Sequence, residues 1–404
     1  MAGVHVVFPE GKGTTTDLEG KYSYAVEPGT YKVEFRYVGY ETQTREVTIF
    51  SSQTVTVDIT LQPFKNELST VVVSASKYDQ ELAEITVSMD IIRPTLIENK
   101  STITCETILE QIPGVTVLDG QLSIRGGSGF AYGAGSRVMV MVDDVPLLAG
   151  DAGDARWNTL PVENVEQIEV IKGASSVLYG SSALNGVVNL RTAAPRLEPE
   201  TKINIYHGTY NDPLRREIQW WDSNPYYSGG NFYHGQRINN MDLTVTGNFL
   251  SDRGYRMGEE ENRGRLTFNT RWRDKKYEGL SYGINGMSQI NKGGLFLIWQ
   301  NDSNVYMPFG GLDPETTTIS YYTNYRYNID PYITFFDKKE NRHSLKTRWY
   351  NARNTNDTDQ GSNSNTWYGE YQFQWKMDSL DASFVSGIMA SYTDVVFDLY
   401  GDHY

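Results

Sequence analysis

The sequence predicts a mainly β protein with three parts: an N-terminal β-sandwich, an α+β domain, and the first strands, about seven, of an antiparallel transmembrane β-barrel. Tyr, Trp and Phe make 13% of the 404 residues, and aromatic residues favour strands. No apolar run approaches the ~18 residues that a membrane-spanning helix needs. Beyond about residue 200, apolar and polar residues alternate over lengths near the ~9 to 11 residues of a tilted membrane strand.

Strand-like runs separated by Gly, Pro and Ser predict a small antiparallel sandwich over residues 1–63. The runs are Tyr22–Val26, Tyr31–Tyr40, Arg45–Ile49 and Thr54–Leu61. Three segments resemble the carboxypeptidase-regulatory-like domain, namely Gly13–Tyr22, Pro28–Val33 and Val38–Glu41. The resemblance implies a seven-stranded β-sandwich. The first strand of that family should precede Gly3–Val6, so we expect a domain that is truncated at its N-terminus.

Residues 81–195 mix strand and helix signals and predict an α+β domain. A helix is expected over Thr102–Gln111, because the pair Pro113-Gly114 that follows is a strong helix breaker. Cys105 is the single cysteine of the chain, which excludes an internal disulfide. We expect its thiol to be a small buried hydrophobe.

Short sequence motifs, most of them containing glycine, follow one another in this domain. They are Leu122–Gly127, Val138–Leu147, Val165–Gly173 continued by Ser176–Gly180, and Asn185–Thr192. In this order and spacing they resemble the plug domain of TonB-dependent outer-membrane receptors. The resemblance implies a plug motif made of Arg125, Gly126, Asp143, Pro146, Glu169, Lys172, Gly173, Gly180, Gly186, Asn189 and Arg191. Asp144 departs from the family, which more often has Gly there, so the turn must accommodate a side chain that tolerates turn geometry.

Four charges of this motif stand among apolar or small residues, namely Arg125, Glu169, Lys172 and Arg191. A plug held in a polar lumen needs ionic contacts that break reversibly. We therefore hypothesise that these charges lock the plug to the barrel wall. The alternative is that they are solvated lumen charges worth ~0 to 1 kcal/mol each.

Residues 64–80 form a linker with a short β-prone run that resembles a TonB box, the segment pulled by a TonB-type energy-transducing protein in the periplasm. Its residues are Leu68, Ser69, Thr70, Val71, Val72, Val73 and Ser74. An extended segment of this kind can add as a strand to the edge of a partner's sheet. The alternative is an ordinary edge strand.

Two plug loops, Gly126–Ser136 and Leu148–Trp157, are expected to face the substrate. The first is rich in Gly and aromatic residues and the second carries charges. The expected substrate-facing residues are Ser128, Phe130, Tyr132, Asp151, Asp154, Arg156 and Trp157. The alternative is that both segments are flexible connections, which Gly and Asp favour.

Residues 196–404 are predicted to be the partial outer-membrane barrel. The expected strands are Thr201–His207, Met241–Phe249, Leu266–Trp272, Leu280–Ile290, Arg342–Asn351, Glu370–Met377 and Ala382–Tyr392. Asn291–Asn341 is expected to be a long extracellular loop, and Trp220, Trp221, Trp272, Trp349, Trp367 and Tyr392 to mark the membrane interfaces. A plugged barrel has ~22 strands, so we expect a C-terminal truncation. A soluble sandwich with one wet face is the alternative.

The motifs of enzymes are weak here. The Gly127–Gly135 cluster lacks the Lys-Ser/Thr ending of a phosphate-binding loop, and the five histidines have no metal-like spacing. We expect no enzyme activity, no catalytic or metal residues and no cofactor. A net charge of −14 argues against nucleic acid as a partner.

The resemblances imply a Gram-negative outer-membrane receptor, with its N-terminal domain and plug accessible from the periplasm, that takes up an iron chelate, cobalamin, a glycan or a peptide. The partners implied are a TonB-type protein, outer-membrane lipid, the imported substrate and a surface lipoprotein. The domain order resembles that of Bacteroidota receptors. The alternative function is a receptor-like surface module for adhesion, signalling or complex assembly without transport.

Overall fold

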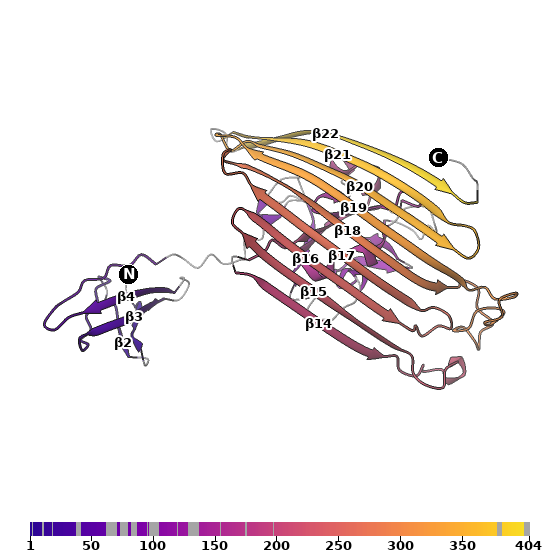
Figure 1. Cartoon of the computed structure of the whole chain (residues 1–404), viewed down its shortest axis with the longest axis horizontal. Helices are drawn as coiled ribbons and strands as arrows, with labels where there is room; N and C mark the ends of the chain where they lie inside the picture. Colours follow the sequence, from indigo (N-terminus) through magenta and orange to yellow (C-terminus); the bar gives the residue numbers. More distant parts are fainter. Residues whose placement is uncertain are drawn as a thin grey trace. The chain divides into compact units, whose positions relative to one another are not determined.

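The computed structural model describes residues 1–399 except 2, 10–11, 18, 38–41, 62–70, 73–79, 82–86, 95, 97–104, 119, 128–136, 154, 174–175, 197 and 378–381. The chain divides into two compact units (Figure 1). The first comprises residues 1–70 and 81–83, and the second comprises residues 71–80 and 84–404.

The N-terminal unit has one four-stranded antiparallel sheet in the order β2-β1-β3-β4. Its strands are β1 (His5–Val7), β2 (Gly13–Thr15), β3 (Gly29–Arg36) and β4 (Gln43–Ile49). Val6, Val33 and Phe35 are buried at its centre. Alternate residues of β3 supply two of these side chains, as expected of a sheet with one buried face.

Two strands predicted for this unit are absent from the described residues. Tyr22–Val26 and Thr54–Leu61 form no strand, although their apolar side chains pack against the sheet core. The Tyr22 hydroxyl donates to the carbonyl of Val57 at 2.9 Å. The second layer is thus extended chain held by side-chain contacts, and the strand prediction there was wrong.

A five-stranded sheet in the order β11-β10-β13-β12-β7 forms the centre of the second unit. The strands are β7 (Met89–Ile92), β10 (Val138–Val142), β11 (Val145–Pro146), β12 (Val165–Lys172) and β13 (Gly186–Thr192). β10 and β13 are parallel, whereas the other pairs are antiparallel. We call this sheet and its connections, residues 87–195, the plug.

Short elements connect the plug strands. They are α2 (Cys105–Leu109), α3 (Ser176–Tyr179), η3 (Trp157–Thr159), η4 (Val162–Asn164), η5 (Ser181–Ala183) and the pair β8 (Val115–Leu118) and β9 (Gln121–Ile124). Upstream, β5 (Val71–Val72) pairs with β6 (Gln80–Glu81). These elements give the plug the α+β character that the sequence predicted.

The plug sheet is buried on both faces. Val140 and Val188 belong to one core cluster, and Met141 and Val187 belong to a second cluster on the other face. This explains why β10 is apolar throughout, since a strand covered on both sides does not alternate. Cys105 is fully buried in the first cluster, as predicted, and burial raises the pKa of its thiol to about 12.

Nine antiparallel strands form a curved sheet in sequence order, which we call the wall (Figure 1). They are β14 (Glu200–Thr209), β15 (Tyr226–Ile238), β16 (Met241–Asp252), β17 (Glu261–Arg273), β18 (Leu280–Leu295), β19 (Ser320–Phe336), β20 (Arg342–Asn356), β21 (Ser362–Met377) and β22 (Ala382–Phe397). The short helix η6 (Arg216–Ile218) lies between β14 and β15. Every wall strand is long enough to cross a bilayer at a tilt.

None of the helices in the described part of the chain has the length and apolar character required to cross a membrane.

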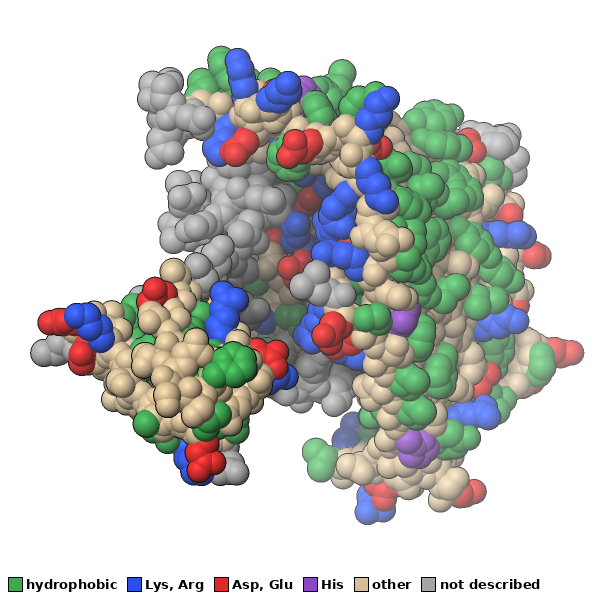
Figure 2. All heavy atoms as spheres, turned by 60° about the vertical axis from the view of Figure 1, so that its left-hand side comes forward, with side chains coloured by type: hydrophobic (Ala, Val, Ile, Leu, Met, Phe, Trp, Pro, Cys, Tyr) green, Lys and Arg blue, Asp and Glu red, His purple; other side chains and the backbone are tan. Residues whose placement is uncertain are grey.

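The wall is polar on the face toward the plug and apolar on the face away from it. In β16, Thr244 and Thr246 are buried whereas Phe249 is 55% exposed. In β17, Arg265 is buried whereas Leu266 is 56% exposed. Hydrophobic side chains accordingly cover the outer surface of the wall in Figure 2. A soluble sandwich would bury the apolar set instead, so the burial pattern is that of a membrane barrel.

Two wall strands were missed by the sequence prediction. β15 was not expected, and β19 lies inside the segment Asn291–Asn341 that was predicted to be one long loop. The expected aromatic girdle also needs correction, because Trp349 and Trp367 face each other within β20 and β21 rather than at strand ends. The wall therefore has nine strands, not about seven.

Candidate functional site

The tight turn between β10 and β11 carries the first contact between plug and wall. Val142 pairs with Val145, so Asp143 and Asp144 form a two-residue hairpin loop. Their φ angles are 52° and 66°, the geometry of a type I′ turn, which Asp and Asn tolerate better than most residues. The turn thus accommodates Asp144, as expected, with its backbone in the left-handed region.

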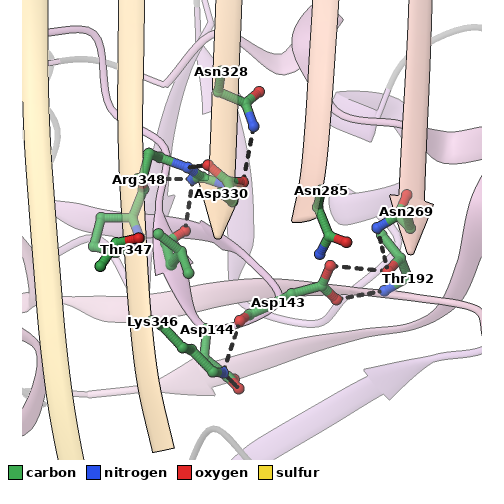
Figure 3. A network of polar contacts seen from close by, with 12 residues as sticks. Asp143, Asp144, Thr192, Asn269, Asn285, Asn328, Asp330, Lys346, Thr347 and Arg348 are labelled. Atoms are coloured by element: carbon green, nitrogen blue, oxygen red, sulfur yellow. Dashed lines mark hydrogen bonds and ion pairs between the residues drawn. The ribbon is translucent and has the colours of Figure 1, made fainter. Parts of the chain in front are cut away.

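Lys346 of β20 binds this turn from the wall. Its ammonium donates to the Asp144 carboxylate at 2.6 Å and to the Asp143 carbonyl at 2.9 Å. Asn189 of β13 holds the turn from behind by donating to the Asp144 carboxylate at 2.8 Å. Figure 3 shows Lys346 pointing at the turn. A glycine at position 144 would leave Lys346 without this carboxylate.

Arg348 is fixed on the wall and reaches the open edge of the plug sheet. It forms a two-point ion pair with Asp330 of β19. Its remaining amino group donates to the carbonyls of Val145 at 3.0 Å and Pro146 at 2.7 Å. β11 is the edge strand of the plug sheet, and edge carbonyls need partners when they are covered. Arg348 supplies them.

Asp143 points away from Lys346 toward β13. Its carboxylate accepts from the backbone N–H of Thr192 at 2.9 Å and from the Thr192 hydroxyl at 2.8 Å. Asn269 of the wall donates to the same hydroxyl at 3.3 Å. Beside Asp143 lies a cavity of about 40 Å³ that is also lined by Asn285 and Asn328. A cavity of this size has room for a few water molecules, and Asp143, Asn285 and Asn328 offer them polar partners.

The two adjacent carboxyls are shifted in opposite directions. Burial raises the pKa of Asp143, and the hydrogen bonds from Thr192 only partly offset the rise. Burial alone would also raise the pKa of Asp144, but Lys346 and Arg191 outweigh it and hold that pKa well below its usual range. The surroundings therefore favour ionisation of Asp144, the carboxyl that contacts the wall, and disfavour ionisation of Asp143.

A second contact joins η4 to β17. Arg265 donates to the Glu163 carboxylate at 2.6 Å and to the Asn158 carbonyl at 2.7 Å. Both charged side chains are almost fully buried, at 3% and 2% exposure. Thr246 of β16 also donates to Glu163, at 3.2 Å. A buried pair of this kind depends on both partners being present.

A third contact joins the plug segment 148–157 to β20, β21 and β22. Asp151 accepts from the Asn354 amide at 2.5 Å and from the Ser362 hydroxyl at 2.7 Å. At Gly150, an added Cβ would lie 2.7 Å from Thr393 and 3.0 Å from Thr366. The segment therefore lies directly against the wall, and position 150 has no space for a side chain.

The structure changes the interpretation of the substrate-facing loops. Asp151 is bound to the wall, and Trp157 is 4% exposed in the plug core, where its indole N–H donates to the Gly120 carbonyl at 2.7 Å. These two residues do not present free side chains to a substrate. Arg156 is half-buried. Ser128, Phe130, Tyr132 and Asp154 lie outside the described residues.

Two of the four charges expected to lock the plug to the wall make contacts within the plug. Arg125 donates to the Ser88 hydroxyl at 2.7 Å, and Lys172 pairs with Asp90 and donates to the Pro113 carbonyl at 2.8 Å. In the part of the chain that the structure describes, Arg125 and Lys172 make these contacts inside the plug and not to the wall. They brace β7, β9 and β12 against one another.

Glu169 and Arg191 also lie in the plug sheet. Glu169 is fully buried and accepts from Gln167 at 2.6 Å and from Asn189 at 3.3 Å. Arg191 lies close enough to lower the pKa of both Asp143 and Asp144. For these two residues the locking role stays a prediction.

The glycines of the plug motif occupy special backbone positions. Gly126, Gly173, Gly180 and Gly186 all have positive φ. At Gly186 an added Cβ would also lie 2.3 Å from the Ile171 carbonyl oxygen and 2.7 Å from the Ile124 side chain. Glycine is therefore required at Gly186 for both conformation and space.

The proposed TonB box lies mostly outside the described residues. This applies to Leu68, Ser69, Thr70, Val73 and Ser74, whereas Val71 and Val72 form β5. The two described positions are in strand conformation, which is the conformation that strand addition requires.

The residues that join plug to wall were missed by the sequence prediction. Glu163, Arg265, Lys346 and Arg348 were not singled out, because the partners that they contact between plug and wall are 83 to 203 residues away in the chain. No group of His, Cys, Asp or Glu suited to a metal occurs among the described residues. The arrangement can hold a plug reversibly through discrete polar contacts.

Comparison with known families agrees with this architecture. Residues 81–187 match the model of the TonB-dependent Receptor Plug Domain. Residues 1–73 match the model of the CarboxypepD_reg-like domain. These matches confirm both resemblances noted in the sequence.

Two curated relatives are vitamin B12 transporters named BtuB. The protein of Vibrio vulnificus strain YJ016 is 31% identical over 145 residues, which are 34% of this chain and 23% of the relative. That of strain CMCP6 is 30% identical over 164 residues, which are 40% of this chain and 26% of the relative. The matches thus span about a quarter of the length of these relatives.

Solved structures share the fold. The siderophore receptor PirA from Acinetobacter baumannii has a TM-score of 0.60 at 14% identity, covering 78% of this chain and 49% of that chain. The ferric yersiniabactin uptake receptor FyuA from Yersinia pestis has a TM-score of 0.59 at 15% identity, covering 76% and 49%. At these identities the likeness concerns the fold alone.

Proposed function

We propose that this chain, whose plug and barrel wall are those of a TonB-dependent receptor, acts in the energised uptake of a substrate across the outer membrane. The observation that carries the proposal is the plug itself, which the polar face of the wall holds through separate side-chain contacts. The outer face of the same wall is apolar, so the wall can lie in lipid. A pull on the N-terminal side of the plug would break these contacts and open a path.

The two ends of the wall support one orientation in the membrane. One end has short turns, including residues 239–240 and 274–279, and the other has longer connections, including residues 210–225 and 296–319. Barrels of the outer membrane have short periplasmic turns and longer extracellular loops. The short turns would therefore face the periplasm, where a TonB-type protein binds the segment around Val71.

The proposed substrate is a small bound molecule, and an iron chelate, cobalamin, a glycan or a peptide are the classes to test. The named relatives are vitamin B12 transporters, and the named structural neighbours are a siderophore receptor and a ferric yersiniabactin uptake receptor. Low coverage of these proteins leaves the choice to experiment. A surface lipoprotein partner is also a proposal that requires its own test.

The test is deletion of Leu68–Ser74 in the whole receptor, with uptake of each labelled substrate class measured in cells. Loss of energised uptake is expected while substrate still binds at the cell surface, because only the coupling segment has been removed. Surface labelling of the variant controls for assembly. Undiminished uptake by a normally assembled variant would overturn the importer proposal and favour a surface module without transport.

A further inference from the structure

A cluster of arginines lies on the inner face of the wall beside the turn 239–240. Arg237 of β15 pairs in register with Asp242 of β16, and Asp242 pairs with Arg271 of β17. Arg273 lies two residues beyond Arg271, so it points to the same face. The register of three adjacent strands thus brings three guanidiniums to one carboxylate.

Asp242 is saturated by these neighbours. It accepts one hydrogen bond from Arg237 at 2.9 Å. It accepts two from Arg271, at 3.1 and 2.8 Å, and two from Arg273, at 3.1 and 2.6 Å. A carboxylate offers about four acceptor sites, whereas each guanidinium has five N–H donors. Asp242 therefore cannot use the donors that remain.

The cluster carries excess positive charge that no described residue neutralises. Within the residues that the structure describes, Asp242 is the acidic side chain paired with all three arginines, and none of them pairs with a second. The plug carboxylates Asp143 and Asp144 are bound to Thr192 and Lys346 instead. Three positive charges thus share one negative charge in a chain whose net charge is −14.

The spare donors are accessible. Asp242 is only 4% exposed, but the side chains of Arg237, Arg271 and Arg273 are 33%, 41% and 40% exposed. Figure 2, which turns this end of the wall toward the viewer, shows Lys and Arg side chains gathered in the hollow. Half-exposed guanidiniums that are held in place by a buried carboxylate are preorganised for an anion, because their planar forks match carboxylate and phosphate oxygens.

We propose that Arg237, Arg271 and Arg273 form an anion-binding site at this end of the lumen, which takes a carboxylate or phosphate group. Asp242 is the positioning residue that aims the three guanidiniums. The site lies where the proposed function places the periplasmic mouth, yet its existence does not depend on transport. An anionic group bound there would balance the excess positive charge of the three arginines.

The test measures binding of inorganic phosphate and of citrate to the purified chain in detergent, by calorimetry at constant ionic strength with chloride as the reference anion. We expect one phosphate or citrate per chain, and a preference for one of them identifies the group. Arg237→Gln keeps Asp242 paired with two arginines and should weaken binding about tenfold, the effect of roughly one charge-assisted hydrogen bond.

Arg253→Gln is the matched control, since Arg253 is 58% exposed outside the wall strands and pairs with Glu260. It should leave binding unchanged. Binding no stronger than that of chloride, or equal weakening by Arg237→Gln and Arg253→Gln, would overturn the proposal. Circular dichroism of each variant confirms that the wall is folded before binding is compared.

Discussion

Asp144 shows how one side chain links a strained backbone position to a contact with another element. Its φ of 66° is in the left-handed region, which costs a non-glycine residue free energy in the folded state. In return its carboxylate reaches Lys346 across the gap between plug and wall. The departure from the family glycine thus adds a charged contact.

The opposite pKa shifts of Asp143 and Asp144 predict opposite effects of pH on stability. Asp144 has a lowered pKa in the folded protein, so its contribution is present above its ordinary pKa of 3.8 and is lost as the pH falls below that value. Asp143 has a raised pKa in the folded protein. Its ionised form therefore destabilises the folded state above pH 3.8, and protonation in acid removes this destabilisation. We expect Asp144→Asn to remove the acid-induced loss of plug protection.

The measurement for this pair is hydrogen exchange of the backbone amides of β10 and β13 between pH 1.5 and 7, corrected for the intrinsic exchange rate. Asp143→Asn is the companion variant, and it should make protection fall more steeply toward acid pH, because the compensating effect is gone. Identical pH profiles for both variants and the unmodified protein would contradict the assignment.

Glu163 is predicted to be a strong determinant of plug retention. Glu163→Gln leaves Arg265 buried without its counterion, which destabilises the plug contact by up to about 3 to 5 kcal/mol. Exchange protection of β12 should drop accordingly. Glu166→Gln, the same change at an exposed position three residues away, is the control and should have little effect. Equal losses in both variants would show that the buried pair is unimportant.

Residue patterns could predict the plug but not its contacts. The motifs around Gly126, Gly173 and Gly186 identified the domain, because glycine in the sequence marks positions where the backbone adopts a conformation that other residues avoid. The partners of Glu163 and Asp144 depend on how the wall register places Arg265 and Lys346, and no local pattern contains that information. The contacts of Arg125 and Lys172 inside the plug could not be predicted for the same reason.

At the scale of elements, β19 contained a signal that could have been found. Tyr327, Ile329 and Ile333 face outward, while Arg326 and Asn328 are buried against the plug, a regular period of two. The strand carries Pro331 in its middle. The structure accommodates it because the pairing of β19 with β20 skips residues 330–331, whereas the pairing with β18 continues. A proline without an N–H is tolerated at such a gap.

β15 was harder to predict because its outward face is mixed. Ser228, His234 and Gln236 stand on the same side as Phe232 and Ile238, so the contrast between faces is weak. The other wall strands were predicted because aromatic and aliphatic residues dominate one side. Alternation therefore located seven strands and missed the two in which composition or proline obscured it.

The outward face of β17 gives a prediction that separates a membrane wall from a soluble sheet. Leu266→Arg places a charge in the middle of this face and should destabilise the lipid-embedded protein by ~2 to 4 kcal/mol. Unfolding in lipid vesicles measures the cost. Leu214→Arg, at a fully exposed position between β14 and β15, should be nearly neutral. A neutral result at both positions would contradict the membrane placement of the wall.

At the scale of the whole molecule, the two compact units have separate cores. Val6, Val33 and Phe35 form a cluster with other residues of the N-terminal unit, and the plug clusters contain none of them. The N-terminal unit should therefore unfold in its own transition. Its stability can change without a change in the plug or wall.

Phe35→Ala tests this independence. Phe35 is 1% exposed, and truncation of a buried Phe typically costs ~3 to 5 kcal/mol. Denaturant unfolding is followed by hydrogen exchange in β3 and in β13. The transition of the N-terminal unit, reported by β3, should move to lower denaturant concentration, whereas the transition reported by β13 should not change. Tyr24→Ala, at a half-buried position in the same unit, serves as the milder control. A matching shift in β13 would show that the units are coupled.

The edge position of β7 has a mechanical consequence. The chain enters the plug sheet through Met89, and among the described residues β7 pairs with β12 alone, over the four residues from Met89 to Ile92. When a strand is pulled away from its neighbour at one end, the hydrogen bonds between the two strands break one at a time. The peak force is then set by single bonds of ~0.5 to 1.5 kcal/mol net. When the force acts along the strands instead, all the hydrogen bonds between them bear the load together. Load arriving from the N-terminal side and directed away from the sheet would thus detach β7 at low force over a long stroke, while Lys346 and Arg265 still hold the rest of the plug.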